Sequence, residues 1–251
     1  MVILWVSLVA AQDWPQYLGP DRTGMSTETG FPIDWIKDPP KVLWKQPLGE
    51  GFGGAAIVGG KVYVLDRVDA KEDVFRCFDM KNGKELWHYS HPDTGEFSFN
   101  GSRAVPTIEG DRAYAVGAMG TVYCMDLKTQ KPVWTHNFMK DFNAELPTWA
   151  YSQSPLIVRD LVIVAPQGRE AGVVAYNKLT GELMWKTGRL SNDPGYSSPV
   201  LATLSGVEQI VQVTPYLSPE LRESEEDEEE DENPEPYFEK GGVYGLSLIH
   251  I

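Results

Sequence analysis

Apolar residues along most of the chain after residue 55 occur in short runs, either alternating with polar residues or rich in β-branched side chains. Examples are KVYVLD (residues 61–66), RAYAVG (112–117) and LVIVAP (161–166). Such runs, bounded by Gly, Asp or Asn, predict short β-strands. We find no long stretch with helical periodicity. The hydrophobic pattern therefore predicts an all-β protein.

One phrase occurs three times and divides these strands into repeats. Its copies begin at Asp79, Asp126 and Asn177 and end at Trp87, Trp134 and Trp185, and Trp44 ends an earlier copy. Successive Trp residues are 43 to 51 residues apart, a period typical of propellers and solenoids. Each repeat contains four strand-like segments, and four antiparallel strands make one propeller blade. We therefore predict a β-propeller of four-stranded antiparallel blades with Trp-docking repeats, here an incomplete arc of about four blades.

The phrase has a structural explanation. An Asx side chain can accept hydrogen bonds from the backbone two residues on, and Gly83 and Gly181 can take positive φ at the far side of the turn. Gln130 replaces this glycine in the second copy, so we expect a tighter or strained turn there. The Trp on the outermost strand is large enough to fill the wedge that opens between blades away from the axis. Cys77 and Cys124 occupy equivalent core positions on neighbouring blades, too far apart for a disulfide.

The pattern divides the chain into segments. Residues 1–11 are apolar and end in small residues, which predicts an export signal, although a buried first strand is the alternative. Residues 12–40 are an N-terminal extension, and residues 41–245 are the partial propeller. An acidic insertion at about 217–240 is expected to be a disordered spacer, or else a weak site for calcium or a basic partner. Residues 246–251 are expected to be an artefactual tail, because no turn phrase or Trp follows and a common transposase-type sequencing adapter read in frame would encode these six residues; a genuine C-terminus is the alternative.

Charge excludes one class of partner. The chain carries a net charge of −14, and nine acidic residues of that total lie in the run ESEEDEEEDE at 223–232. No basic stripe is present, so we expect no binding to nucleic acid. The apolar start is too short to span a bilayer, and we expect no transmembrane segment.

Four stretches are similar to a known family: DWPQYLGPDRTG (13–24), residues 102–134, SPLIVRDLVIVAPQG (154–168) and GYSSPVL (195–201). They resemble exported bacterial PQQ-like propeller repeat proteins of the planctomycete type. The resemblance implies a ring of seven or eight blades, monomeric at full length, of which this chain would be a fragment. That family includes quinoprotein dehydrogenases, outer-membrane assembly scaffolds and members of unknown role, so the resemblance is specific for fold and not for cofactor.

Aligning the repeats places one group of polar and aromatic residues just before the innermost strands, at one mouth of the propeller axis. The group consists of Arg103, Gln153 and Ser197, together with Trp149, Tyr151 and Tyr196. An arginine fork and aromatic faces are able to bind a planar anion. The alternative is that these residues satisfy the ends of the inner strands and hold channel water.

The remaining polar residues give weaker indications of a functional site. Asp141, Asn143 and Glu145 form a carboxylate and amide cluster that we expect to cap a loop. The four histidines follow no metal-ligand spacing: His88, His91, His136 and His250. The sequence thus predicts no catalytic or metal site.

These features favour an exported, periplasmic propeller that acts as a binding scaffold for envelope proteins or for a small ligand on its axis. One alternative is a dehydrogenase of alcohols or sugars that uses pyrroloquinoline quinone with calcium and whose remaining blades are missing. Another is a scaffold for outer-membrane protein assembly. The sequence itself fixes no cofactor.

Overall fold

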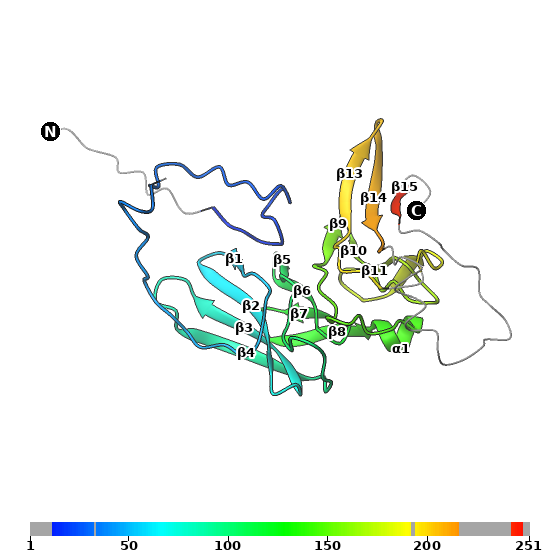
Figure 1. Cartoon of the computed structure of the whole chain (residues 1–251), viewed down its shortest axis with the longest axis horizontal. Coiled ribbons are helices and arrows are strands. Elements are labelled where there is room, and N and C mark those ends of the chain that lie inside the picture. Colours follow the sequence, from blue (N-terminus) through cyan, green and yellow to red (C-terminus); the bar gives the residue numbers. More distant parts are fainter. Residues whose placement is uncertain (1–11, 33, 192–193, 216–241, 248–251) are drawn as a thin grey trace.

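The computed structural model describes residues 12–32, 34–191, 194–215 and 242–247. Within these residues the chain forms four antiparallel sheets that follow one another in sequence and lie side by side in an arc (Figure 1). Three sheets have four strands and the last has three. The predicted export signal and the acidic insertion lie outside the described residues, as does His250.

Within each sheet the strands are hydrogen-bonded in sequence order. The first sheet contains β1 (Ala56–Val58), β2 (Lys61–Val68), β3 (Glu72–Asp79) and β4 (Glu85–Pro92). The second contains β5 (Thr107–Glu109), β6 (Arg112–Val116), β7 (Thr121–Asp126) and β8 (Lys131–Asn137), and the short helix α1 (Phe138–Phe142) follows it. The third contains β9 (Leu156–Val158), β10 (Leu161–Val164), β11 (Val174–Asn177) and β12 (Leu183–Lys186). The fourth contains β13 (Val200–Leu204), β14 (Val207–Val213) and β15 (Val243–Ser247), so Leu246 and Ser247 belong to a strand. The predicted fold class is confirmed.

The repeated phrase forms the turn between the third and fourth strands of a sheet. Oδ1 of Asp79 accepts hydrogen bonds from the backbone of Lys81 (2.9 Å) and Asn82 (3.1 Å). Asp126 and Asn177 each accept the equivalent two bonds in their own turns. The hydrogen bonds that the backbone N–H groups of Thr129 and Lys128 donate to Asp126 lower the pKa of its carboxyl. The predicted Asx turns are therefore present in all three complete sheets.

The Trp of one repeat docks on the turn of the next sheet. The indole N–H of Trp134 donates to the carbonyl of Lys178 (3.2 Å), and that of Trp44 donates to the carbonyl of Met80 (2.8 Å). Each indole lies flat against the turn glycine, because a Cβ on Gly181 or Gly83 would lie 2.6 Å from an indole atom. Trp134 is only 8% exposed. The predicted role of Trp as a wedge between blades is confirmed at these two interfaces.

The second sheet departs from this pattern at Gln130. This residue adopts φ 59° where Gly83 and Gly181 have φ 71° and 77°, which confirms the expected strain. At the equivalent positions Gly83 and Gly181, a Cβ would collide with the docked indole, and Gln130 carries such a Cβ. In the part of the chain that the structure describes, Trp87 makes no hydrogen bond to the turn carbonyl of Leu127. Its ring lies 5.7 Å from that of Phe75 in its own sheet and packs against the core layer between the first and second sheets.

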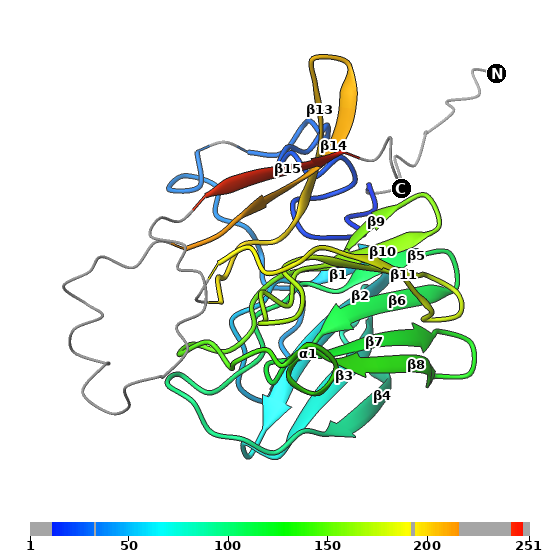
Figure 2. The same ribbon diagram turned by 90° about the vertical axis from the view of Figure 1, so that its right-hand side faces the viewer.

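The hydrophobic core consists of three layers, one between each pair of neighbouring sheets. Figure 2 shows the second and third sheets stacked on each other, with α1 at one end of the stack. Cys77 and Cys124 are free and fully buried, one in each of the first two layers, which confirms that they are core residues. Burial raises the pKa of each thiol to about 11.

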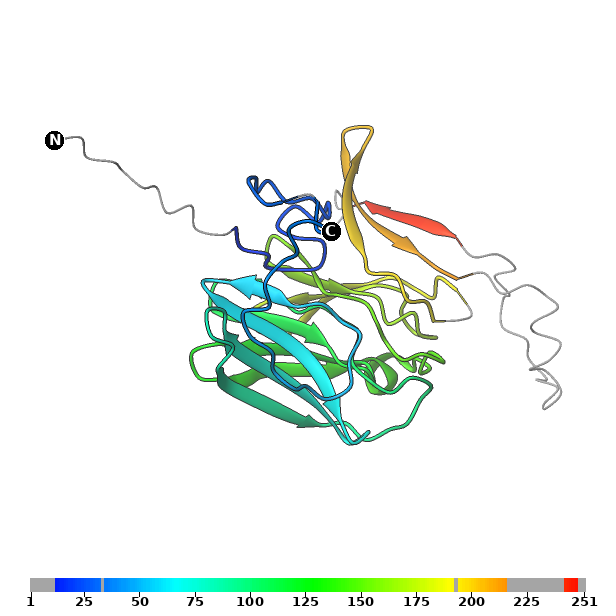
Figure 3. The same cartoon turned by 60° about the vertical axis from the view of Figure 1, so that its left-hand side comes forward.

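The N-terminal extension crosses the innermost strands (Figure 3). Trp14 pairs with Ile57 of β1 through two backbone hydrogen bonds, and the carbonyl of Pro15 accepts from the backbone of Ile108 in β5. The guanidinium of Arg22 donates to the carbonyls of Pro155 (3.1 Å) and Pro199 (3.3 Å), which precede β9 and β13. The extension therefore contacts all four sheets near the axis.

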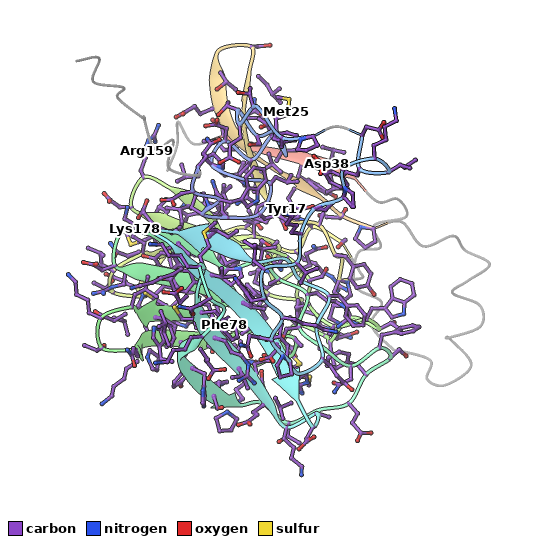
Figure 4. The ribbon with its side chains drawn as sticks, turned by 90° about the vertical axis from the view of Figure 1, so that its left-hand side faces the viewer. Tyr17, Met25, Asp38, Phe78, Arg159 and Lys178 are labelled. Atoms are coloured by element: carbon purple, nitrogen blue, oxygen red, sulfur yellow. The ribbon has the colours of Figure 1, made fainter. Side chains whose placement is uncertain are left out.

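The side chains follow the same arrangement (Figure 4). Tyr17, Met25 and Asp38 of the extension lie above the sheet that holds Phe78. Arg159 and Lys178 lie at one edge of the molecule, where the Lys178 amine donates to the carbonyl of Arg159 (2.7 Å). This edge carries the hairpins and turns of the third sheet.

Candidate functional site

A pocket opens where the segments that precede the first strand of each sheet converge. Its volume is about 340 Å³. Its lining comes from all four repeats: Phe52, Phe99, Arg103, Trp149, Ser152 and Tyr196. Because these segments precede the innermost strands, the pocket lies at a mouth of the propeller axis, and we call it the mouth pocket.

Arg103 is held in the mouth pocket by its own loop. One terminal nitrogen donates to the carbonyl of Gly101 (2.6 Å), and the other donates to the carbonyls of Phe99 (2.6 Å) and Ser98 (3.3 Å). The guanidinium also lies over the ring of Phe52, 5.0 Å from its centroid. Partial burial lowers the pKa of Arg103. The arginine thus stabilises the loop and leaves few donors for a ligand.

The opposite wall is formed by Trp149 and Tyr196. Their ring centroids are 5.5 Å apart, and the ring planes are inclined by 33°. The hydroxyl of Ser152 donates to the carbonyl of Tyr196 (3.0 Å), which joins the third and fourth repeats at this point. Trp149 is 51% exposed and Phe99 is 73% exposed, so large aromatic faces remain open to solvent.

Backbone strain accompanies this arrangement. Phe99 has φ 57° and Ala150, next to Trp149, has φ 60°, a region that residues with a Cβ rarely adopt. The bond from Arg103 to the carbonyl of Phe99 helps to hold this conformation. Strained residues that the surrounding structure fixes occur preferentially at ligand and active sites. Two residues with positive φ therefore lie in or beside the lining of the mouth pocket.

The structure brings together three of the six residues that the sequence placed at this mouth. Arg103, Trp149 and Tyr196 line the mouth pocket. The sequence analysis missed Phe52, Phe99 and Ser152. Phe52 directly precedes the pair Gly53-Gly54 of the repeat alignment, and this position could have indicated it.

The other three residues serve the inner strands. Gln153 is 1% exposed, and its amide oxygen accepts from the backbone of Ala165 (2.6 Å). Tyr151 is also buried, and its hydroxyl donates to the carbonyl of Glu145 (2.8 Å). The hydroxyl of Ser197 donates to the carbonyl of Val213 (2.7 Å). These contacts match the alternative reading, in which such residues satisfy the ends of the inner strands.

A buried ion pair fixes the first sheet against the second. Arg67 and Asp73 are both fully buried, with Nη1 and Oδ1 3.0 Å apart. Oδ2 of Asp73 accepts from the Tyr123 hydroxyl (3.0 Å) and from the backbone of Ala118 (3.1 Å) in the second repeat. Because every oxygen and charge in this group has a partner, it is a structural connection between sheets.

The carboxylate cluster after β8 caps its loop, as predicted. Oδ2 of Asp141 accepts from the backbone of Asn137 (3.1 Å), Asn143 ends α1 with φ 47°, and Glu145 pairs with Arg169 (3.1 Å). Among the residues that the structure describes, no group of three His, Cys, Asp or Glu side chains could hold a metal ion. The described residues also include no helix long and apolar enough to cross a membrane.

Comparisons with known proteins agree with this architecture. The described sheets and repeats define a PQQ-like β-propeller repeat domain, related to BamB and to quinoprotein alcohol dehydrogenases. The family model described as outer membrane protein assembly factor BamB matches residues 26–105 and 70–217. The chain therefore belongs to this family.

Individual relatives share only part of their length with the chain. Quinohemoprotein alcohol dehydrogenase ADH IIB of Pseudomonas putida is 28% identical over 156 residues, which cover 58% of this chain and 19% of that protein. The crystal structure of a quinohemoprotein alcohol dehydrogenase from Comamonas testosteroni superposes with a TM-score of 0.56 at 21% identity, covering 72% of this chain and 28% of that one. This superposition supports the fold alone.

The mouth pocket does not fit a quinone with a cation. A quinone carrying carboxylates needs free donors, whereas both terminal nitrogens of Arg103 already donate to carbonyls. A hard cation needs a cluster of oxygen ligands, and the described residues contain no such group of carboxylates.

Proposed function

We propose that this propeller is an exported binding scaffold whose mouth pocket takes an apolar or aromatic group. The main support is that all four repeats supply aromatic or polar side chains to one pocket of about 340 Å³. Its walls consist largely of ring faces, which bury apolar surface and stack on planar groups. Most ligand pockets combine apolar walls with a few polar groups in this way.

The contacts of Arg103 favour an apolar ligand over an anion. A carboxylate could bind its fork only by displacing the carbonyls of Phe99 and Gly101, to which the arginine donates at 2.6 Å. That exchange would break the short bonds that hold the strained backbone at Phe99. An aromatic ring can instead lie between Trp149 and Phe99 with no change in these bonds.

The natural ligand that we propose is an aromatic side chain in an extended segment of an envelope protein. A family named for an outer membrane protein assembly factor supports a partner of this kind. The apolar start of the chain supports export. Protein recovered from a periplasmic fraction should begin near Gln12, and an N-terminal sequence that retains residues 1–11 would refute cleavage there.

Binding can be tested with indole and with an alanine-based peptide that carries one Trp. We expect calorimetry to show saturable binding of both probes to the full chain. Trp149→Ala should weaken binding about tenfold, which corresponds to about 1.4 kcal/mol. Trp35→Ala is the matched control, because Trp35 is 62% exposed and lies outside the pocket. Equal loss in both variants, or no binding by the wild type, would refute the proposal.

The relationship to quinohemoprotein alcohol dehydrogenase ADH IIB supports one competing function, oxidation of alcohols or sugars with a quinone. The chain, incubated with pyrroloquinoline quinone and calcium, can be assayed for a bound-cofactor absorption band and for dye-linked turnover. Our proposal predicts neither. A band abolished by Arg103→Leu would instead establish the dehydrogenase function.

A further inference from the structure

A second pocket lies between the first and second sheets, at the end where β4 and β8 finish. Its volume is about 680 Å³, compared with about 340 Å³ for the mouth pocket. The end of β4 and the loop after it supply His91, Asp93 and Thr94 to one wall. The other wall comes from the β6–β7 hairpin, the end of β8 and α1. The described linings of the two pockets share no residue, and we call this cavity the intersheet pocket.

Hydrogen bonds hold the two walls of the intersheet pocket together. The amide nitrogen of Asn137 donates to the hydroxyl oxygen of Thr121 (3.0 Å) and to the carbonyl of Met119 (3.3 Å). Its amide oxygen accepts from two backbone N–H groups of α1. The hydroxyl of Thr121 in turn donates to Oδ2 of Asp93 on the first wall (3.2 Å). Because these groups already use one another as partners, this part of the pocket is preorganised for a ligand.

Other polar groups of the lining are unused. Asp93 and Asp141 each accept through Oδ2 only, and Oδ2 of Asp141 takes the backbone N–H of Asn137 (3.1 Å) and lies 3.1 Å from Nδ1 of His136. Within the described residues, the second oxygen of each carboxylate accepts no hydrogen bond, and the ammonium of Lys140 forms neither a hydrogen bond nor an ion pair. Three more lining side chains make no hydrogen bond to a described residue: His91, Thr94 and Thr135. The pocket therefore offers both acceptors and donors.

The charges of the intersheet pocket disfavour ionic ligands. A bound anion would face the carboxylates of Asp93 and Asp141, and burial, followed by the charge of Asp73, already raises the pKa of Asp93. A bound cation would face the ammonium of Lys140. A hydroxyl group is uncharged and is both a donor and an acceptor, so neighbouring hydroxyls of one ligand can serve a carboxylate and an ammonium together. The unused groups therefore match a neutral ligand with several hydroxyls.

Apolar side chains complete the lining, namely Pro92, Met119 and Met139. A sugar ring has apolar carbon–hydrogen faces and a rim of hydroxyls, so it matches a lining of both kinds. The volume also lies within the range of about 300–1,000 Å³ that is usual for ligand pockets. We propose that the intersheet pocket binds one or two units of a neutral saccharide, whose hydroxyls donate to the free oxygens of Asp93 and Asp141 and accept from Lys140. This site is separate from the mouth pocket and does not depend on the function proposed for it.

Calorimetric titration of the full chain with cellobiose, maltose and lactose tests the class of ligand. We expect saturable binding of at least one of these neutral disaccharides, in the millimolar range. Spermidine, citrate and cyclohexanol represent a cation, an anion and a single hydroxyl, and none of them should compete. Absence of binding by all three disaccharides, or tighter binding of spermidine or citrate, would overturn the proposal. If cellobiose binds, tighter binding of cellohexaose identifies a polysaccharide chain as the source of the sugar, and equal affinity identifies a free sugar.

Substitutions test the position of the site. Lys140→Ala and Asp93→Asn should each weaken disaccharide binding about tenfold, because each removes a charged partner of a sugar hydroxyl. Lys131→Ala and Asp160→Asn are the matched controls, since both residues are exposed and lie outside the pocket. Thermal melting followed by circular dichroism would show that each variant is folded. Equal affinities of the pocket variants and their controls would overturn the proposal.

Trp149→Ala separates the two pockets. It should leave disaccharide binding unchanged while it weakens binding of indole, and Lys140→Ala should do the reverse, because the two described linings share no residue. Loss of disaccharide binding in Trp149→Ala but not in Lys140→Ala would place the sugar in the mouth pocket and refute the intersheet site. Binding of disaccharides without binding of indole would refute only the function proposed for the mouth pocket.

Discussion

Gly181 offers a sharp test of how the Trp phrase holds neighbouring sheets together. The residue has φ 77°, and a Cβ added to it would lie 2.6 Å from Cγ of Trp134. Alanine at such a φ costs about 1 kcal/mol. It would also push the indole off the turn, which removes its hydrogen bond to Lys178, about 1 kcal/mol, and some of its apolar burial. We expect Gly181→Ala to lower the free energy of unfolding by about 3 kcal/mol.

Gly206 provides a matched control for the backbone effect. It also has φ 77°, but an added Cβ would have no atom within 4 Å. Gly206→Ala should therefore lower the free energy of unfolding by about 1 kcal/mol only. Urea titrations followed by circular dichroism would measure both changes. In a Trp134→Ala background the two glycine substitutions should have similar effects, because the indole is gone.

The result that would refute this reasoning is equal destabilisation by Gly181→Ala and Gly206→Ala in the wild-type background. It would mean that the indole does not need the flat face of the glycine. A large effect of Gly181→Ala that persists without Trp134 would likewise show that the contact with Trp134 is not the cause. Either outcome would remove docking as the reason for the repeated glycine.

Four further predictions concern the core and the turns. Gln130→Gly should raise the free energy of unfolding by about 1 kcal/mol in urea titrations, because glycine adopts positive φ without strain. It should also shift the fluorescence of Trp87 to shorter wavelength, because the turn would then offer the indole the same flat face as Gly83 and Gly181 do. An unchanged free energy of unfolding would contradict the strain at Gln130. Arg67→Met should destabilise it by about 3–5 kcal/mol, because it leaves Asp73 charged and buried, and a loss below about 1 kcal/mol would contradict this role. Burial, and after it the charge of Asp73, raises the pKa of Asp93, so the folded state holds the proton of the Asp93 carboxyl more tightly than the unfolded state does. The free energy of unfolding therefore falls as pH rises through the window between the ordinary and the raised pKa. Asp93→Asn should gain stability relative to wild type above that window, and parallel pH profiles of the two proteins would refute this. The thiols of Cys77 and Cys124, whose pKa burial raises to about 11, should not react with a disulfide reagent at pH 8 until urea unfolds the chain. Fast labelling of the folded chain would show that the two thiols are exposed and would contradict their burial.

The sequence by itself determined the repeat architecture of this protein. Alternating apolar residues set the strands, and Asp79 and its equivalents set the turns, because both signals act between neighbours in the chain. The spacing of Trp134 and its equivalents then set the number of sheets. These features depend on local geometry that each repeat carries within itself.

Only the tertiary structure decided the binding site. The sequence aligned Arg103, Gln153 and Ser197 as equivalents, yet the structure turns the first toward the pocket and the other two toward inner-strand backbone. Side-chain direction in a loop depends on contacts between repeats, such as the Ser152 bond to the carbonyl of Tyr196, which no single repeat encodes. The same limit applies to residues 41–46, whose strand-like pattern is evident in the sequence, although the described structure assigns no strand there.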